Sequence, residues 1–339
     1  MIIDAHSHIG KDYMQEECKL SSYVEYLKKV GIDMGLVMPV PSPIYTVTRR
    51  GSNCILKTLS FKYDEYKQSF NYYTAVIQEN GEEQIRAVIK NPYKYFNYKY
   101  YQEIKSNDDE TIRLEFVPII HPKFDTIQYL DKLVGDMNPI AFKIHGIGAG
   151  ISTEDMSEGI IRFLQEKRIP LILHTDYDNL ESGNKKERMI LRNKNKASNW
   201  ARFLKTNNLK GVLNHGAVLD KEAIDIVNES DNIILAIGPD LDMNAFPNRL
   251  MVDRKILEQF GYLEILRRWV RPDKLLFDVD YNWNMDRNTR ELDYGCVERV
   301  NNTWLNLEDR KRIFSENALN FFNIRDRCKI ASENEKEKQ

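Results

Sequence analysis

A length of 339 residues suits one large domain or two ordinary ones, because barrels of alternating strands and helices commonly run to about 250 residues and more. The composition, 42% hydrophobic and 29% charged, supplies a substantial core and excludes a largely disordered chain. A net charge of -2 and the lack of a long basic stripe argue against a nucleic-acid-binding protein, so a small-molecule substrate is expected.

Cysteine usage and the chain ends indicate a cytoplasmic protein. The four cysteines form no C-x-x-C pair, so neither a zinc knuckle nor a disulfide framework is predicted. The first residues reach a charged motif after two apolar positions, which leaves no room for a signal peptide, and no stretch is long enough to span a membrane. Residues 331–339 are almost wholly polar and are predicted to be a disordered tail.

Short runs rich in Ile, Val and Leu alternate with stretches of helical spacing, which is typical of βα units around a parallel sheet. Residues 1–330 are therefore predicted to form one α/β domain, a (β/α)8 TIM barrel. An open doubly wound sheet is less favoured, because no glycine-rich phosphate loop follows the first run. The eight runs of strand length are Ile2–His8, Met34–Val40, Leu114–His121, Ile140–His145, Pro170–His174, Gly211–His215, Ile233–Ile237 and Leu275–Asp280.

Apolar faces predict the helices between these strands. Ser22 and Glu25 have the spacing of a capping box, which predicts that the first helix begins at this point. A second helix is predicted near Tyr95–Ile104. Later faces are formed by Ile127, Leu130 and Val134, by Ile160, Phe163 and Leu164, by Trp200, Phe203 and Leu204, by Leu263, Leu266 and Val270, and by Ile313, Ala318 and Phe321.

The connection at about residues 41–91 is too long for a plain βα loop, whose usual length is about 2–6 residues. It is predicted to be an insertion with a hairpin, in which Tyr72–Glu79 and Glu82–Ile89 flank the turn at residues 80–81, Asn-Gly. Its position on the carboxyl side of the strands would let it cover an active site. A surface decoration or a contact in a homo-oligomer explains it equally well. Shorter polar excursions on the same side are Asp176–Ala197 and Pro239–Lys255.

Every one of the six histidines falls at or just before the end of a predicted strand: His6, His8, His121, His145, His174 and His215. In a barrel of this type the carboxyl ends of the strands carry the active site. Two residues apart on one strand, His6 and His8 face the same way and can reach one ion. Histidine is the commonest metal ligand near neutral pH, so a divalent metal is predicted, with zinc as the first candidate.

Four segments together resemble the amidohydrolase superfamily. They are Asp-Ala-His-Ser-His at residues 4–8, Leu-Ile-Leu-His-Thr at 171–175, Leu-Asn-His-Gly at 213–216, and the aspartate on the last predicted strand, Asp280. The resemblance is closest to the amidohydrolase-related branch that also contains aminocarboxymuconate-semialdehyde decarboxylase and several lactonases. Residues 276–281, Leu-Phe-Asp-Val-Asp-Tyr, are similar to that branch's Phe-Gly-Ser-Asp-Tyr segment, with Asp278 in place of glycine.

This resemblance implies that His6, His8, His174 and Asp280 hold the metal and that His215 orients or deprotonates the attacking water. Asp280 would accept a proton from that water and pass it to the leaving group, so Asp280 and His215 are the expected catalytic residues. His121 and His145 are expected to contact the substrate or support the ligands, and a purely structural role stays open for each. For Asp280 the alternative is a cap of the following turn.

Lys143 bears on the number of ions. The segment Phe-Lys-Ile-His-Gly at residues 142–146 resembles that of urease and other binuclear members, in which a carboxylated lysine bridges two ions. His6, His8 and Asp280 would then hold one ion, and His174 and His215 the other. Lys143 can also remain a cation that binds a substrate carboxylate, or form an interior ion pair with Asp4 or Asp278. One ion is favoured.

Hydrolysis of an amide, lactone or ester bond of a small molecule by a metal-activated water is the main hypothesis. Its alternative is non-oxidative decarboxylation of an unsaturated or aromatic acid, which carbon dioxide release would reveal. Phosphoester hydrolysis is a third chemistry that no feature favours. A catalytically silent barrel that binds a metabolite is the non-enzymatic alternative, against which the intact ligand set argues.

Overall fold

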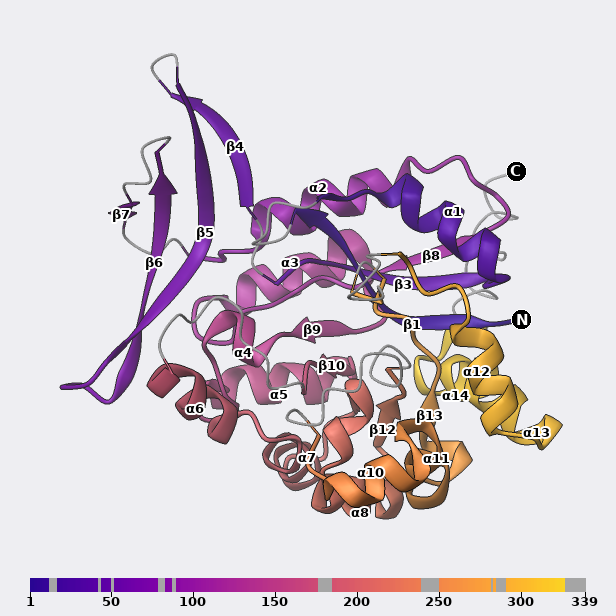
Figure 1. Cartoon of the computed structure of the whole chain (residues 1–339). Coiled ribbons are helices and arrows are strands. Elements are labelled where there is room, and N and C mark those ends of the chain that lie inside the picture. The colour runs from indigo at the N-terminus through magenta and orange to yellow at the C-terminus, as the bar shows by residue number, and fades with distance from the viewer. Residues whose placement is uncertain are drawn as a thin grey trace.

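The computed structural model describes residues 1–11, 17–41, 44–49, 52–78, 83–86, 90–175, 185–238, 250–281, 283–284 and 291–326. The tail predicted at residues 331–339 lies outside these ranges. Within them, each of the eight predicted runs overlaps one parallel strand, and helices alternate with the strands (Figure 1), so the α/β class is confirmed. The strands are β1 (Ile3–Lys11), β3 (Met34–Pro39), β8 (Arg113–Phe116), β9 (Phe142–Ile144), β10 (Leu171–Leu173), β11 (Gly211–Leu213), β12 (Ile233–Ala236) and β13 (Leu275–Leu276).

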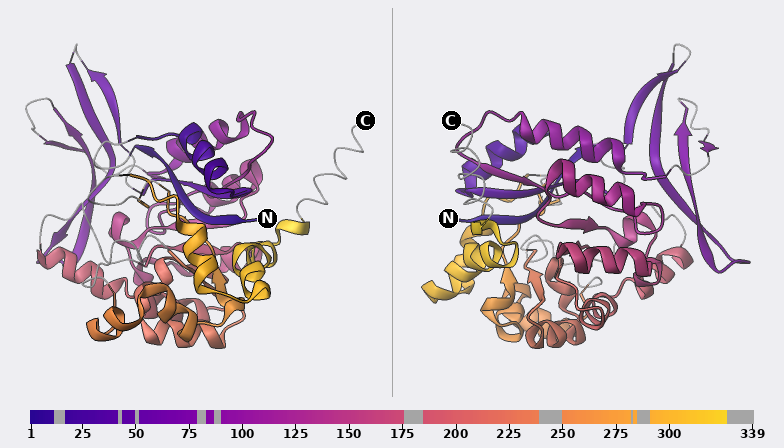
Figure 2. Two further views of the ribbon diagram at one scale, coloured as in Figure 1. Left: turned by 45° about the vertical axis from the view of Figure 1, so that its right-hand side comes forward. Right: turned by 180° about the vertical axis from the view of Figure 1, so that it is seen from behind.

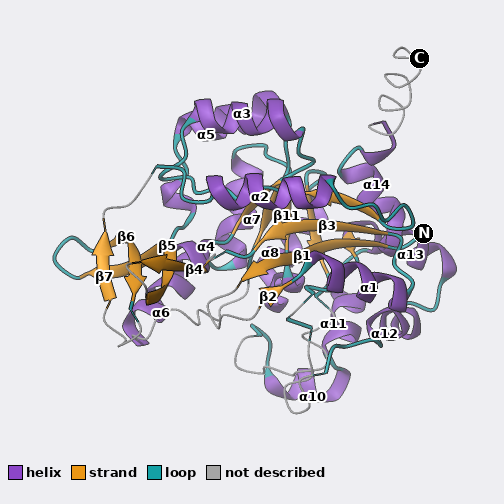
Figure 3. Cartoon of the chain, turned by 90° about the horizontal axis from the view of Figure 1, so that it is seen from above, coloured by secondary structure: helices purple, strands orange, loops and turns teal. Residues whose placement is uncertain are grey.

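Helices flank the parallel strands on both sides (Figure 3). They include every apolar face predicted from the sequence. Their bounds are α1 (Leu20–Val30), α2 (Lys94–Lys105), α3 (Ile127–Met137), α4 (Gly146–Ala149), α5 (Glu158–Lys167), α6 (Lys185–Lys194), α7 (Ala197–Thr206), α8 (Lys221–Glu229), α10 (Arg254–Phe260), α11 (Tyr262–Trp269), α12 (Cys296–Thr303), α13 (Leu307–Lys311) and α14 (Asn317–Phe321), with a π-helical turn at Arg312–Glu316.

Two details of the helix prediction were wrong or incomplete. α1 begins at Leu20 rather than after Ser22, and its N-cap residue Lys19 makes no side-chain cap. The helix start is therefore set by the apolar face, and the predicted capping-box residues lie inside the helix. Furthermore, α6 occupies part of the excursion Asp176–Ala197, where the apolar signal is weak. Within the described ranges, no helix is long and apolar enough to cross a membrane.

The parallel strands belong to two sheets, so the structure shows no closed barrel, in contrast to the prediction. The sheet orders are β2-β1-β3-β8, in which the short β2 (Glu17–Cys18) is antiparallel, and β13-β12-β11-β10-β9. Isolated backbone hydrogen bonds connect the two sheets at both junctions. Ile119 forms a parallel bridge with Lys143, and the Ala5 N–H donates to the Phe277 carbonyl at 3.0 Å. β13 has only two residues, and the pairing at each junction is too short to join the two sheets into one.

The core has an inner and an outer part. The inner cluster takes alternate side chains from the parallel strands or their flanking residues, among them Ile3, Met34, Leu36, Ile172 and Val212. The larger outer cluster packs the helices against the strands. Alternation with period two explains this division, because successive side chains of a strand point to opposite faces.

Strands β4 to β7, which follow β3, form a separate antiparallel sheet. It has the order β4-β5-β6-β7 and lies at the end of the molecule opposite the N-terminus (Figures 1 and 2). The predicted hairpin corresponds to the β6–β7 pair, and its turn lies outside the described residues. The Tyr63 N–H donates to the buried carboxylate of Glu187 in α6 at 2.8 Å, which joins this sheet to the main body. The strands are β4 (Ile44–Arg49), β5 (Ser52–Asp64), β6 (Ser69–Ile77) and β7 (Glu83–Arg86).

Candidate metal centre

An irregularity in β1 turns two histidines toward the interior. Between its pairings at Asp4 and Ser7, β1 contains one residue more than the opposing β3. Such a bulge shifts the alternation of side chains by one position. Ile3 and Ala5 lie in the inner core, and His6, within the bulge, has its ring edge to face with that of His8, after the bulge, with centroids 4.7 Å apart.

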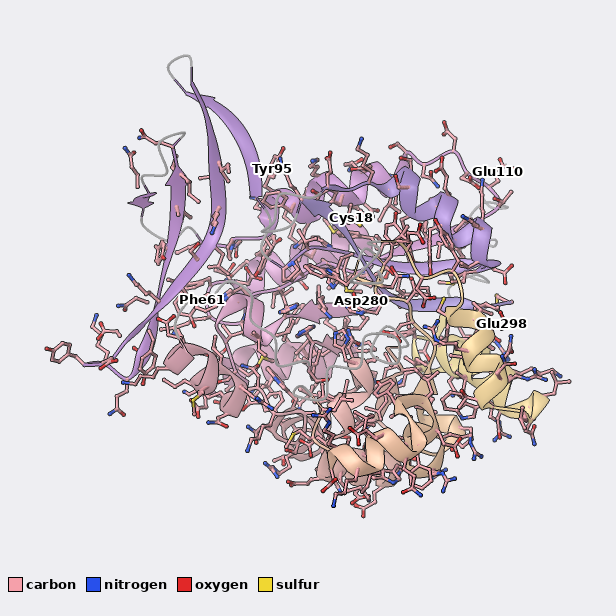
Figure 4. All side chains as sticks on the ribbon, viewed as in Figure 1. Cys18, Phe61, Tyr95, Glu110, Asp280 and Glu298 are labelled. Atoms are coloured by element: carbon pink, nitrogen blue, oxygen red, sulfur yellow. The ribbon has the colours of Figure 1, made fainter. Side chains whose placement is uncertain are left out.

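Asp280 lies in the interior of the molecule (Figure 4), and ring nitrogens of three histidines surround its carboxylate. Its backbone adopts a left-handed φ of +50°, which aspartate tolerates better than most residues, and its N–H donates to the His6 carbonyl at 2.9 Å. Its carboxylate lies 3.6 Å from Nδ1 of His6, 4.0 Å from Nε2 of His8 and 4.0 Å from Nδ1 of His215. His6, His215 and Asp280 each offer a buried ligand atom, and these atoms lie within 4.8 Å of one another.

His174 and His145 extend this group. Nδ1 of His174 lies 3.0 Å from Nε2 of His215, and the His174 ring stacks on that of His145 with centroids 3.7 Å apart. Nδ1 of His145 accepts a hydrogen bond from the N–H of Gly148 at 2.8 Å. The rings of His6 and His215 are 5.6 Å apart. Five of the six histidines thus form one connected cluster, which we call the histidine cluster: His6, His8, His145, His174 and His215.

Lys143 is buried against the histidine cluster. Its Nζ lies 2.9 Å from Nε2 of His6. Burial lowers the pKa of Lys143 to about 7, and the nearby carboxylates of Asp280 and Asp278 partly oppose this shift. The ion pair of Lys143 with Asp4 or Asp278 stays a prediction. The Asp278 carboxylate accepts a hydrogen bond from the Gly238 N–H at 2.6 Å.

Four rings of the histidine cluster, those of His6, His8, His145 and His174, have lowered pKa values, which favours their neutral form. Burial, assisted by the charge of Lys143, lowers the pKa of His8 to about 3 and that of His6 well below its usual range. Burial also holds the pKa values of His145 and His174 well below the ordinary value. A neutral imidazole has the lone pair that metal ligation requires.

His121 lies apart from the histidine cluster, among aromatic side chains. Its ring centroid is 5.5 Å from that of Tyr72, 6.4 Å from Tyr93 and 4.6 Å from Phe124. Its backbone N–H donates to Asp125 at 2.8 Å, and burial raises the pKa of this carboxyl group to about 8. The contacts of His121 therefore connect it to the inserted sheet through Tyr72.

The inserted sheet holds the turn that follows β9. Gly150 has a φ of +68°, and the ring of Phe61 lies 2.7 Å from the place where a Cβ atom would stand. The Tyr72 hydroxyl donates to the Gly150 carbonyl at 2.7 Å. This turn begins at His145, so the insertion contacts the segment that follows a member of the histidine cluster. No signal in the sequence distinguishes Phe61, because one aromatic residue in a strand does not reveal which residue it contacts.

These groups fit a divalent metal. In a tetrahedral zinc site with bonds of about 2.1 Å, ligand atoms lie roughly 3.4 Å apart. The separations of 3.6 to 4.0 Å around Asp280 are close to that value. In the described part of the chain, Nδ1 of His6 and Nε2 of His174 are buried and make no hydrogen bond. Buried polar atoms ordinarily have partners, so these two nitrogens are candidates for ligation.

Comparison with known proteins shows a likeness in fold. No protein-family model and no curated protein matches the chain. A probable 2-pyrone-4,6-dicarboxylic acid hydrolase from Acinetobacter baumannii is similar in structure, with a TM-score of 0.56 and 11% identity, over 95% of this chain and 99% of that one. An amidohydrolase II structure has a TM-score of 0.56 and 12% identity, over 95% of this chain and 100% of that one.

An amidohydrolase from Burkholderia multivorans with bound zinc has a TM-score of 0.54 and 9% identity, over 95% of this chain and 99% of that one. At these identities the comparison shows the fold alone. The chain has the fold of amidohydrolase structures, which confirms at that level the resemblance predicted from the sequence.

Proposed function

We propose that this protein is a metal-dependent hydrolase that cleaves an amide, lactone or ester bond of a small molecule. The observation that carries the proposal is the buried Asp280 carboxylate, with ring nitrogens of His6, His8 and His215 at 3.6 to 4.0 Å. The fold shared with amidohydrolase structures supports it. We further propose that the two parallel sheets act as one (β/α)8 barrel with this group at its carboxyl end, since hydrogen bonds cross both junctions.

In this proposal His6, His8, His174 and Asp280 hold one divalent ion, with zinc as the first candidate. The buried, unbonded nitrogens of His6 and His174 support this set, as do the low pKa values of the rings. The similar Burkholderia multivorans structure contains zinc, which supports the choice of metal. When bound, such an ion supplies Lewis-acid activation of water and of a carbonyl group.

Asp280 and His215 would carry the protons. Oδ2 of Asp280 lies 4.0 Å from Nδ1 of His215, so a proton accepted by the carboxylate can be shared with the imidazole. Asp280 passes this proton to the leaving group, while His215 orients the attacking water. His145, stacked on His174, supports the ligand set, and His121 lies farther out, beside the inserted sheet.

Decarboxylation is the second candidate, because Lys143 is suited to bind an acid substrate. A buried lysine next to His6 can hold the carboxylate of an acid substrate close to the ion. The same lysine would also bind a carboxylate-bearing lactone. Carbon dioxide release, measured with unsaturated and aromatic acids, separates the two reactions.

Metal content and one substitution test the proposal. Protein purified without added ion should contain a stoichiometric divalent metal, and its absence would favour a silent metabolite-binding barrel. In a screen of lactones, amides, esters and acids, Asp280→Asn should abolish turnover while most of the metal stays bound. Asp125→Asn, at a buried aspartate outside the histidine cluster, is the matched control and should retain turnover. Turnover by Asp280→Asn would refute the role of this carboxylate.

A further inference from the structure

The carboxylate of Asp4 lies at the bulge of β1 and accepts four hydrogen bonds. Its donors are the backbone N–H groups of His6 at 3.1 Å and Val279 at 3.0 Å, the hydroxyl of Ser7 at 2.5 Å and the hydroxyl of Tyr23 at 2.5 Å. The residue is completely buried. A bulge leaves backbone groups outside the strand ladder, and Asp4 satisfies one of them directly.

The same network attaches the segment around Asp280 to β1. Three consecutive N–H groups donate to β1: Val279 to the Asp4 carboxylate at 3.0 Å, Asp280 to the His6 carbonyl at 2.9 Å, and Tyr281 to the Ser7 hydroxyl at 3.0 Å. Asp4 and Ser7 therefore help to fix the position of the Asp280 carboxylate relative to His6 and His8, the candidate ligands of β1.

Tyr23 approaches this network from helix α1. Its side chain is fully buried, and its hydroxyl lies where a Cβ atom on Gly35 of β3 would stand. Because residue 35 is glycine, this space is free for the Tyr23 hydroxyl. Helix α1 can therefore place that hydroxyl next to β1, the strand that carries His6 and His8. The neighbouring Tyr26 is also buried, but its hydroxyl donates to the Asp293 carbonyl at 2.7 Å, away from Asp4.

We propose that Tyr23, Asp4 and Ser7 are positioning residues, which fix the bulge of β1 and the segment at Asp280 so that their side chains meet around one ion. The inference rests on the proposed metal centre and adds the residues that position its ligands. None of the three is proposed as a ligand. Groups that orient metal ligands commonly change metal affinity by about 10–100-fold when they are replaced.

The experiment compares two Tyr-to-Phe substitutions on the same helix. Zinc dissociation constants are measured by competition with a chromophoric chelator, at a temperature where each variant is folded. We expect Tyr23→Phe to weaken zinc binding by about 10-fold or more. Tyr26→Phe removes a buried hydroxyl of the same kind and should stay within about threefold of the original protein, even if its melting temperature falls equally.

Ser7→Ala is the second variant and removes the hydroxyl that bonds to Asp4 and to the Tyr281 N–H. Ser7→Ala should also raise the zinc dissociation constant. It tests the positioning role if Tyr23→Phe does not fold. Unchanged zinc affinity in a folded Tyr23→Phe or Ser7→Ala protein would overturn the positioning role and leave the metal centre standing. If the unmodified protein binds no zinc, both the proposed function and this inference fail.

Discussion

Nε2 of His215 lies 3.0 Å from Nδ1 of His174, so one of these rings donates a hydrogen bond and the other accepts it. In a neutral imidazole one nitrogen carries the proton and the other has the lone pair. The donor ring therefore has its lone pair on the outer nitrogen, whereas the acceptor ring has a proton there. Only one of the two histidines can then ligate an ion through its outer nitrogen.

We expect His174 to be the ligand of this pair. The carboxylate of Asp280, 4.0 Å from Nδ1 of His215, favours a proton on that nitrogen, so His174 is the donor of the shared bond and has its lone pair on the outer Nε2. His174→Ala should therefore weaken zinc binding by more than about 100-fold, and His215→Ala by about 10-fold with loss of turnover. Chelator competition measures both constants. The reverse order would make His215 the ligand and His174 its support.

The contact between the inserted sheet and the turn after β9 predicts that replacing Gly150 lowers the stability of the protein, whereas replacing a glycine without such a contact does not. Gly150→Ala would place a Cβ atom 2.7 Å from the Phe61 ring, at a φ of +68° that alanine disfavours. The free energy of unfolding should fall by about 1–3 kcal/mol, as measured by urea denaturation. Gly135→Ala is the control, since nothing lies within 4 Å of its Cβ and it stands in α3, where alanine should be neutral or stabilising. Equal effects at the two positions would contradict the contact.

Asp125 predicts a pH dependence of stability. Burial raises its pKa from 3.8 to about 8, so between these values the folded protein keeps a proton that the unfolded chain has lost. The folded state then binds more protons, and this group's contribution to stability falls as the pH rises. Asp125→Asn removes the effect, so its stability relative to the original protein should grow from near zero at pH 4 to on the order of a few kcal/mol at pH 8. Denaturation curves at pH 5 and pH 8 test this, and parallel changes in both proteins would contradict it.

The parallel strands and the clustering of histidines could be predicted from the sequence for a physical reason. Each strand is short and apolar, and its last residue leads directly to the side where neighbouring strands also end, so His6, His174 and His215 were expected to converge. The structure brings these three together. His121 stands apart, with its ring packed against Tyr72, Tyr93 and Phe124.

Other features could not be predicted because they depend on contacts between distant segments. Tyr23 was an ordinary member of an apolar helix face until the structure placed its hydroxyl on Asp4. The bulge of β1 has no composition signal, although it decides which side chains point inward. The division into two sheets depends likewise on pairing lengths, such as the two residues of β13, that apolar runs do not reveal.

The same histidine pair allows a prediction of the number of ions. A binuclear site with a carboxylated Lys143 would require His174 and His215 both to ligate the second ion, but their mutual hydrogen bond leaves a lone pair on only one outer nitrogen. Lys143 also lies 2.9 Å from Nε2 of His6, where a free amine is already in contact with a candidate ligand. We therefore expect one zinc per chain by elemental analysis, with or without added bicarbonate, and the same ratio in a folded Lys143→Met protein. A ratio of two that falls in Lys143→Met would instead establish the bridging lysine, and it would require the bond between His174 and His215 to break when the ions bind.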